Sequence, residues 1–134
     1  INKLLRNQEL FFSMNKSLKP HLNTGKYVFV QLKRISEIDK DEIVCFLNEG
    51  KTLSVILNEE YAKDNNLLYE SINAWITLKI NSSLDSVGLT SLFSKALADL
   101  KISCNVISGY KHDHIFVNYD KRDLAINALK KLKF

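Results

Sequence analysis

The sequence predicts an α+β protein in which helices cover antiparallel sheets. Three patterns in its second half support this class. Residues 75–80 place isoleucine or leucine at every second position, the period of a strand with one covered face. Residues 89–100 repeat apolar side chains every three or four positions, which is typical of an amphipathic helix. Two β-rich runs, residues 104–110 and 112–119, meet at a glycine-containing turn and should form a hairpin.

A final helix is expected after the hairpin. We expect Asp120 to cap it, because an aspartate side chain accepts hydrogen bonds from the free amides of a first helical turn. Its buried side would carry Ala125, Ala128, Leu129 and Leu132. The resulting order of strand, helix, strand, strand and helix is typical of a split β-α-β arrangement.

The first half of the chain predicts a similar alternation of strands and helices. Residues 27–32 and 52–57 are rich in β-branched and apolar residues, and we expect them to be strands. A short helix should begin at residues 58–60, where the acidic side chains favour a first helical turn. Another short helix is expected within residues 1–24, and Pro20 should end it.

The segment between the two strands of the first half predicts a longer helix. Ser36 and Asp39 are spaced as a capping signal, and Gly50 stands where a left-handed C-terminal cap is wanted. The apolar face of this helix would carry Ile43, Phe46 and Leu47. The first half is then predicted as helix, strand, helix, strand and short helix.

The chain should divide into two small units that pack closely together, which a length of 134 residues allows. Residues 65–73 link the halves without the Pro, Gly or Ser richness of a flexible spacer. We therefore expect an N-terminal unit over residues 1–70 and a C-terminal unit over residues 71–134. Each half has a strand, a capped amphipathic helix and a returning strand, which is a weak internal repeat.

Composition and charge narrow the class of protein. Hydrophobic residues make up 46% and charged residues 25%, and no apolar run approaches the roughly 20 residues of a membrane-spanning helix. The net charge of +4 comes mostly from scattered lysines, whereas phosphate-binding surfaces usually concentrate arginine. Cys45 and Cys104 lie in apolar segments without metal-ligand spacing. We expect buried reduced thiols in a cytoplasmic protein.

Six short motifs are more specific together than any one alone. They are YVFV at 27–30, EG-TL at 49–53, WITL at 75–78, SSL-SVGLT at 82–90, ISCNV at 102–106 and HDHIFV at 112–117. In this order they resemble small bacterial proteins with two ACT-like units in tandem, and the second half resembles the regulatory domains of aspartokinases. The resemblance implies two ferredoxin-like units and a regulatory sensor that binds an amino acid at a unit or subunit interface, without catalysis or cofactor.

The turn before the second large helix is the candidate ligand site that this resemblance implies. The backbone amides after Gly88 would hold a carboxylate at the positive end of the helix, and the glycine would permit a close approach. Asp85 or the side chain of Asn105 would receive the ammonium group. Alternatively, Asp85 and Ser86 only cap the helix. The candidate ligand-binding residues are Asp85, Ser86, Val87, Gly88, Leu89, Thr90, Asn105, Val106 and Ile107.

Other kinds of chemistry have less support in the sequence. His112, Asp113 and His114 supply too few ligands for a metal site, and no nucleophile turn or phosphate loop occurs, so we expect no enzyme. A nucleic-acid-binding module is the alternative, because related sheets stack bases on aromatic residues, but the hairpin lacks the corresponding basic-aromatic motif. Exposed sheet edges or helix faces should pair two copies into a homodimer.

Overall fold

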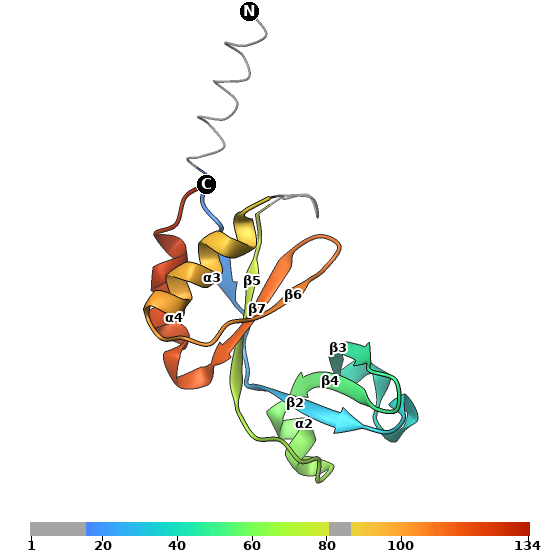
Figure 1. Ribbon diagram of the computed structural model, residues 1–134. Helices are drawn as coiled ribbons and strands as arrows, with labels where there is room; N and C mark the ends of the chain where they lie inside the picture. The colour runs from blue at the N-terminus through green and yellow to red at the C-terminus, as the bar shows by residue number, and fades with distance from the viewer. Residues whose placement is uncertain (1–15, 81–86) are drawn as a thin grey trace, which may run out of the picture.

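The computed structural model describes residues 16–80 and 87–134, and its strands join into one sheet (Figure 1). The strand order is β3-β4-β2-β5-β7-β6, and β1 also pairs with β5. The strands are β1 (Pro20–Leu22), β2 (Tyr27–Leu32), β3 (Ile43–Asn48), β4 (Leu53–Asn58), β5 (Asn73–Leu78), β6 (Asn105–Ser108) and β7 (Asp113–Asn118). The helices in the described residues are α2 (Glu59–Asp64), α3 (Leu89–Asp99) and α4 (Arg122–Lys130), with 3-10 turns η1 (Ile35–Glu37), η2 (Lys40–Glu42) and η3 (Tyr119–Lys121). Within these two ranges, no helix is long and apolar enough to cross a membrane.

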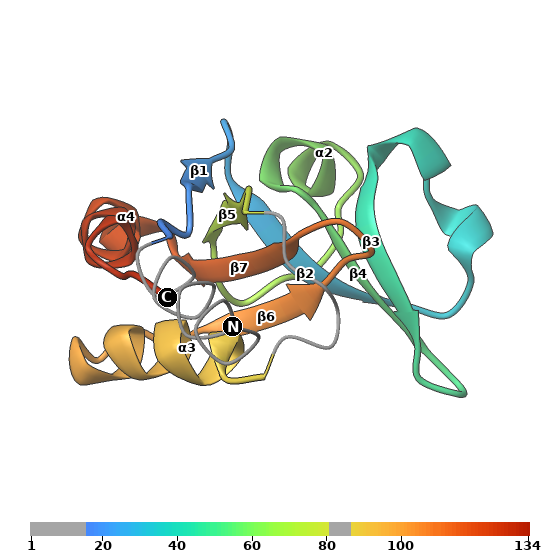
Figure 2. The same cartoon turned by 90° about the horizontal axis from the view of Figure 1, so that it is seen from above.

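In the C-terminal unit, α3 and α4 lie side by side and cover one face of β1, β5, β7 and β6 (Figures 1 and 2). The predicted alternation of residues 75–80 is confirmed, because Ile76 and Leu78 are fully buried in the core beneath the helices. The predicted helical stripe is confirmed as well, and its buried members are Leu89, Phe93 and Leu97. The predicted hairpin is β6 paired antiparallel with β7.

The first described residues belong to the sheet of the C-terminal unit. β1 runs antiparallel to β5, with Pro20 opposite Leu78, and Leu18 is fully buried in the core under α3 and α4. Lys16 and Phe134 exchange two backbone hydrogen bonds of 3.0 Å, so the start of the described chain and its end lie together. The segment before β2 thus packs in the C-terminal unit, although the strand that follows it belongs to the N-terminal unit. The division near residue 70 stays a prediction.

The N-terminal unit is built from β2, β3, β4 and α2. The strands predicted at residues 27–32 and 52–57 are confirmed as β2 and β4, which pair antiparallel along their whole length. The short helix is confirmed as α2, and Asn58 caps it by accepting a hydrogen bond of 2.8 Å from the amide of Glu60. Its core is a second apolar cluster formed by Val28, Val30, Leu32, Ile38, Val55, Leu57 and Ala62.

The longer helix predicted between these strands is wrong, because residues Ile43–Asn48 form strand β3. β3 pairs antiparallel with β4, and Asp39 caps only the short turn η2 before it. Gly50 has the expected left-handed backbone, with φ of +102°, but it lies in the β3–β4 hairpin turn. The helical spacing of Ile43, Phe46 and Leu47 was outweighed by the β preference of an Ile-Val-Cys-Phe run that has β4 as a partner.

Two further expectations concern the ends of helices. Asp120 does not cap the last helix: the side chain of Asn118 accepts a hydrogen bond of 2.9 Å from the amide of Asp120 and begins η3, and α4 starts after it. The apolar side of α4 is as predicted, since Ala125 and Leu129 are fully buried. The helix expected before Pro20 falls mainly on residues 1–15, which lie outside the described residues.

Candidate functional site

The sheet face opposite α3 and α4 carries an aromatic cluster that joins the two units. Alternate residues of β5 face away from the helical core, and Trp75 is one of them. The ring of Trp75 stacks on Phe116 with centroids 6.0 Å apart, and meets Tyr27 edge-on at 5.2 Å. Phe29 meets Phe116 edge-on at 5.6 Å. Aromatic residues of β2 therefore pack directly on residues of β5 and β7.

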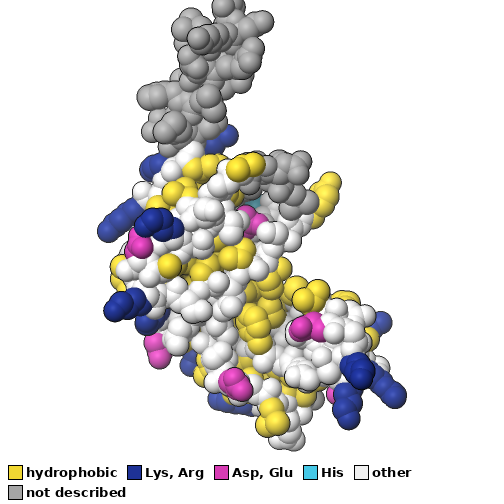
Figure 3. All heavy atoms as spheres, in the orientation of Figure 1, with side chains coloured by type: hydrophobic (Ala, Val, Ile, Leu, Met, Phe, Trp, Pro, Cys, Tyr) yellow, Lys and Arg dark blue, Asp and Glu magenta, His cyan; other side chains and the backbone are white. Residues whose placement is uncertain are grey.

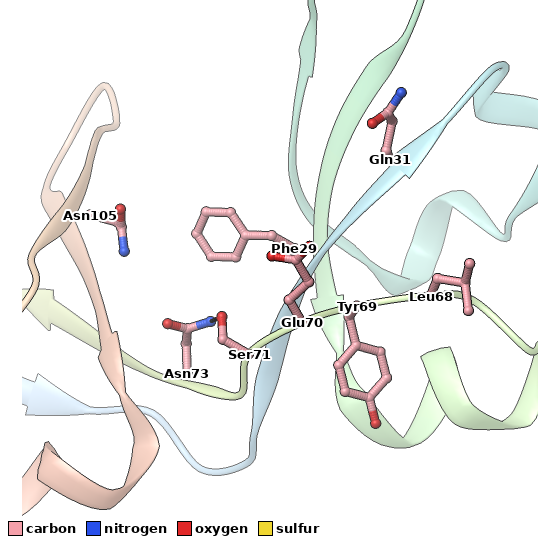
Figure 4. A pocket seen from close by; sticks show the side chains of 8 residues that line it. All are labelled: Phe29, Gln31, Leu68, Tyr69, Glu70, Ser71, Asn73 and Asn105. Carbon is pink, nitrogen blue, oxygen red and sulfur yellow. Dashed lines mark hydrogen bonds between the residues drawn. The ribbon is translucent and has the colours of Figure 1, made fainter.

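A pocket of about 710 Å³ opens beside this aromatic cluster, which we call the junction pocket. Its lining comes from β2, from the segment before β5, and from the first residues of β5 and β6. The lining residues are Phe29, Gln31, Leu68, Tyr69, Glu70, Ser71, Asn73 and Asn105 (Figure 4). In the orientation of Figure 1, hydrophobic side chains gather at the waist between the part with α3 and the part with β3 and β4 (Figure 3).

Two carboxamide side chains in the junction pocket make only long hydrogen bonds. The side-chain nitrogen of Asn73 lies 3.5 Å from the backbone oxygen of Tyr27 and 3.5 Å from the hydroxyl of Ser71. That of Asn105 donates to the backbone oxygen of Phe116 over 3.4 Å. Ordinary N–H···O bonds measure about 2.9–3.0 Å. A ligand that offers a closer acceptor would therefore compete well for these donors.

The charge in the junction pocket is negative. Among the described residues that line it, Glu70 is the only one with a charged side chain, and it is exposed. The hydroxyl of Tyr69 is committed elsewhere, since it donates to the carboxylate of Glu59 over 3.0 Å. Burial, and then this contact with Glu59, raise the pKa of Tyr69, which keeps the phenol neutral. Amide groups, one carboxylate and an aromatic ring are thus available to a ligand.

The predicted ligand residues do not all lie in one place in the structure. Asp85 and Ser86 lie outside the described residues. Val87 and Thr90 are exposed, Gly88 is the first residue before α3, and Leu89 is buried in the helical core.

On β6, Asn105 lines the junction pocket, while the two residues that follow it face opposite sides of the sheet. Val106 packs against the core under the helices, and Ile107 packs against the aromatic cluster.

The start of α3, which Gly88 precedes, and the start of β6, at Asn105, lie at opposite ends of the C-terminal unit (Figure 1). Asn105 begins β6 and is paired with Phe116, which is also paired with Trp75 near the start of β5. Gly88 follows the far end of β5. A Cβ built on Gly88 would meet no atom of the described chain within 4 Å. The glycine is therefore explained by its positive φ of +89°, and not by a close neighbour. Among the residues that the structure describes, one chain therefore does not bring the start of α3 together with Asn105.

Sequence reasoning missed most of the junction pocket. The sequence predicts no ligand role for Phe29 and places Asn73 in the link between the halves. They meet because Tyr27 of β2 pairs with Asn73 of β5 across the two units. The available signal in the sequence was a polar residue directly before an apolar run, and the structure buries that residue, Asn73, to 5% exposure.

His114 belongs to a hydrogen-bonded network on the same sheet face. Its Nδ1 accepts from the indole nitrogen of Trp75 at 3.0 Å and lies 3.0 Å from the hydroxyl of Thr77. Asn23 donates to that hydroxyl over 2.9 Å. Burial lowers the pKa of His114, and nearby His112 lowers it further. Because an indole N–H can only donate, Nδ1 carries no proton in this arrangement.

The remaining candidates for chemistry have structural explanations. In the part of the chain that the structure describes, no three His, Cys, Asp or Glu side chains are placed to hold a metal ion. Cys45 and Cys104 are free thiols of intermediate burial. Burial raises the pKa of Cys104, which keeps the thiol protonated and a poor nucleophile.

Comparisons with known proteins agree with this architecture. Two family models described as ACT domain match the chain, one over residues 12–74 and one over residues 70–131. A search of curated proteins gave no significant match.

Solved structures give the same picture. A Vibrio cholerae protein of unknown function, described as a possible transport protein, is 36% identical with a TM-score of 0.82, over 96% of this chain and 98% of that one. The ligand-free regulatory subunit of aspartate kinase from Thermus thermophilus shares the fold at 8% identity and a TM-score of 0.64, over 86% and 96% of the two chains. An Agrobacterium tumefaciens protein is 15% identical with a TM-score of 0.61, over 82% and 84%. The chain therefore belongs to the ACT-domain family, with two ACT domains in tandem, and this membership indicates a regulatory, ligand-binding role.

Proposed function

We propose that this protein is a regulatory sensor that binds a free amino acid in the junction pocket and performs no catalysis. The observation that carries the proposal is the position of Asn105. This candidate ligand residue lines a pocket that also contains two other carboxamides, from Asn73 and Gln31. The pocket volume of about 710 Å³ is within the usual range for small-molecule sites.

An amino acid would use the polar groups of the pocket in a simple way. The side-chain N–H groups of Asn73 and Asn105 would donate to the ligand carboxylate, replacing their long bonds with shorter, charge-assisted ones. The carboxylate of Glu70 would accept from the ligand ammonium. The ring of Phe29, which is 38% exposed, would contact the ligand side chain. Binding would bridge β2 and β6, and so would couple the ligand to the angle between the units.

The start of α3 remains a second proposed contact region, with the residues 85–90 that precede and begin it. Because Gly88 and Asn105 lie at opposite ends of one C-terminal unit, a single ligand would touch both only across a subunit interface. The junction pocket and the start of α3 are therefore alternatives within one chain, and a substitution at each can distinguish them.

We also propose a homodimer that pairs the edge strand β3 with β3 of a second copy. β3 ends the strand order, and its six residues contain neither a charge nor a proline, the usual protections of an edge. Phe46 is 54% and Leu47 is 63% exposed there. The opposite edge, β6, has only four residues, and its apolar side chains pack into the interior clusters. Pairing of identical strands about a twofold axis is self-complementary.

Two further observations bear on the class of protein. Tyr27 and Phe116 are buried and Trp75 is partly buried, so these rings are not available to stack nucleic-acid bases. Free cysteines at positions 45 and 104 fit the reducing environment of the cytoplasm, where we place the protein.

Thermal-shift screening of the 20 amino acids, followed by calorimetry on those that respond, tests the proposed function. A ligand at 100 times its dissociation constant should stabilise the fold by about 2.7 kcal/mol. Asn105→Ala should abolish the response, and Asn127→Ala on exposed α4 should preserve it. If none of the 20 changes the melting temperature of the folded wild-type protein, the amino-acid proposal is wrong.

A further inference from the structure

We propose that the junction pocket selects its ligand by charge: it accepts neutral and basic amino acids and rejects aspartate and glutamate. This inference rests on the proposed function and adds the class of ligand to it. Two observations support it: the described lining has a single carboxylate with no cationic side chain, and its other groups are amides, hydroxyls and apolar side chains.

A ligand side chain with a carboxylate would find no opposite charge in the pocket. In the described lining, the one charged group is the carboxylate of Glu70, and the others are amides, hydroxyls and apolar groups. The two carboxamide donors suffice for the α-carboxylate that every amino acid carries. A second carboxylate would lie near Glu70, and two like charges at close range repel each other.

Two lysines beside α2, Lys26 and Lys63, have other partners. Lys26 lies over the ring of Tyr119, 4.9 Å from its centre, and Lys63 lies 3.7 Å from the carboxylate of Glu59. Both line a separate pocket beside α2. Neither belongs to the lining of the junction pocket, so neither neutralises an acidic ligand there.

The apolar part of the lining suits a side chain with methylene groups. Phe29 is 38% exposed, and Leu68 is 90% exposed at the rim. Figure 4 shows the ring of Phe29 between Asn105 on one side and the segment with Glu70 on the other. A lysine or glutamine side chain could lay its methylene groups against this ring and direct its polar end to Glu70 or Gln31.

Calorimetry with L-lysine, L-glutamine and L-glutamate on the wild type and on Glu70→Gln tests the inference. Glu60→Gln is the matched control, because Glu60 is an exposed acid outside the junction pocket. For the wild type, we expect lysine or glutamine to bind at least about tenfold more tightly than glutamate. Glu70→Gln should reduce the preference for lysine over glutamate, and Glu60→Gln should leave that preference unchanged.

The outcomes separate this inference from the proposed function. Glutamate binding as tight as that of lysine and glutamine, abolished by Asn105→Ala, would overturn the charge selection and leave an amino-acid site in the pocket. A selectivity that Glu70→Gln leaves unchanged would also overturn it. No binding of any of the 20 amino acids would overturn the proposed function itself, and the charge selection with it.

Discussion

The indole nitrogen of Trp75 donates a hydrogen bond to Nδ1 of His114 over 3.0 Å, and this contact ties β5 to β7 beside the aromatic cluster. Nδ1 must be free of a proton to accept it. The hydroxyl of Thr77 lies at the same distance from Nδ1 and is itself held by Asn23. Protonation of His114 would place two donors against each other at the centre of this network.

Stability should therefore fall as the pH is lowered past the ordinary histidine range. Burial and His112 lower the pKa of folded His114 below its usual 6.5, although Asp113 opposes them. Well above a pH of about 6.5 the ring is neutral in both the folded and the unfolded state, and the network contributes fully. As the pH falls toward the folded pKa, the unfolded state binds more protons, so the free energy of unfolding decreases.

Urea unfolding at pH 7.5 and pH 5.0, followed by the fluorescence of Trp75, measures this loss, because the chain has one tryptophan. His114→Asn is the matched variant, since its side-chain oxygen can accept from the indole without titrating near neutral pH. We expect it to lose less stability than the wild type over this interval. Equal losses in both proteins would assign the pH dependence to other groups.

Truncation of the aromatic cluster should destabilise both units together. Phe116 is 1% exposed and contacts aromatic rings from β2 as well as β5. We expect Phe116→Ala to cost about 3–5 kcal/mol of unfolding free energy, the usual range for a buried phenylalanine. Tyr110→Ala, at a residue 90% exposed, should cost less than about 0.5 kcal/mol. Chemical denaturation measures the unfolding free energy of both variants. If Phe116→Ala costs as little as Tyr110→Ala, the aromatic cluster does not hold the two units together.

The sequence patterns succeeded where a single periodicity dominates. The stripe that buries Phe93 and Leu97 was visible in the spacing alone, because every turn of α3 repeats it. The prediction for the segment of β3 was wrong because the spacing of its apolar residues fits a helical face, while its β-branched composition fits a strand. Only pairing with β4 decides between them, and that partner is a matter of tertiary structure.

The candidate site shows the same limit. Asn105 was predicted as a ligand residue from the resemblance to ACT domains. Phe29 and Asn73 could not be joined to it from spacing, because the crossing of β2 with β5 at Tyr27 and Asn73 brings them there. Local patterns specify elements and caps. The register between distant strands creates the pocket.

Substitution of Gly88 should distinguish the two proposed ligand regions. Gly88→Ala puts a Cβ on a backbone with φ of +89° where nothing lies within 4 Å, so only conformational strain of about 1–2 kcal/mol is expected. Gly50→Ala is the matched control, because Gly50 also has a positive φ and open surroundings. Amino-acid affinity should be unchanged in both variants. A loss of affinity confined to Gly88→Ala would move the site to the start of α3.

The exposed edge of β3 should govern self-association. A lysine at the edge opposes strand addition, because pairing would require two like charges to approach across the twofold axis and lose hydration. We expect the double variant Phe46→Lys, Leu47→Lys to fold normally, since both side chains are more than half exposed, and to raise the dimer dissociation constant by at least about tenfold.

Sedimentation equilibrium of the wild type and of the double variant measures that constant directly. Leu124→Lys on α4 is the matched control, because it adds a lysine at an apolar residue that is 48% exposed and lies away from β3. It should dimerise as the wild type does. If the wild type is dimeric and the β3 variant remains equally so, the copies meet at another surface. If Leu124→Lys alone produces monomers, that surface includes α4.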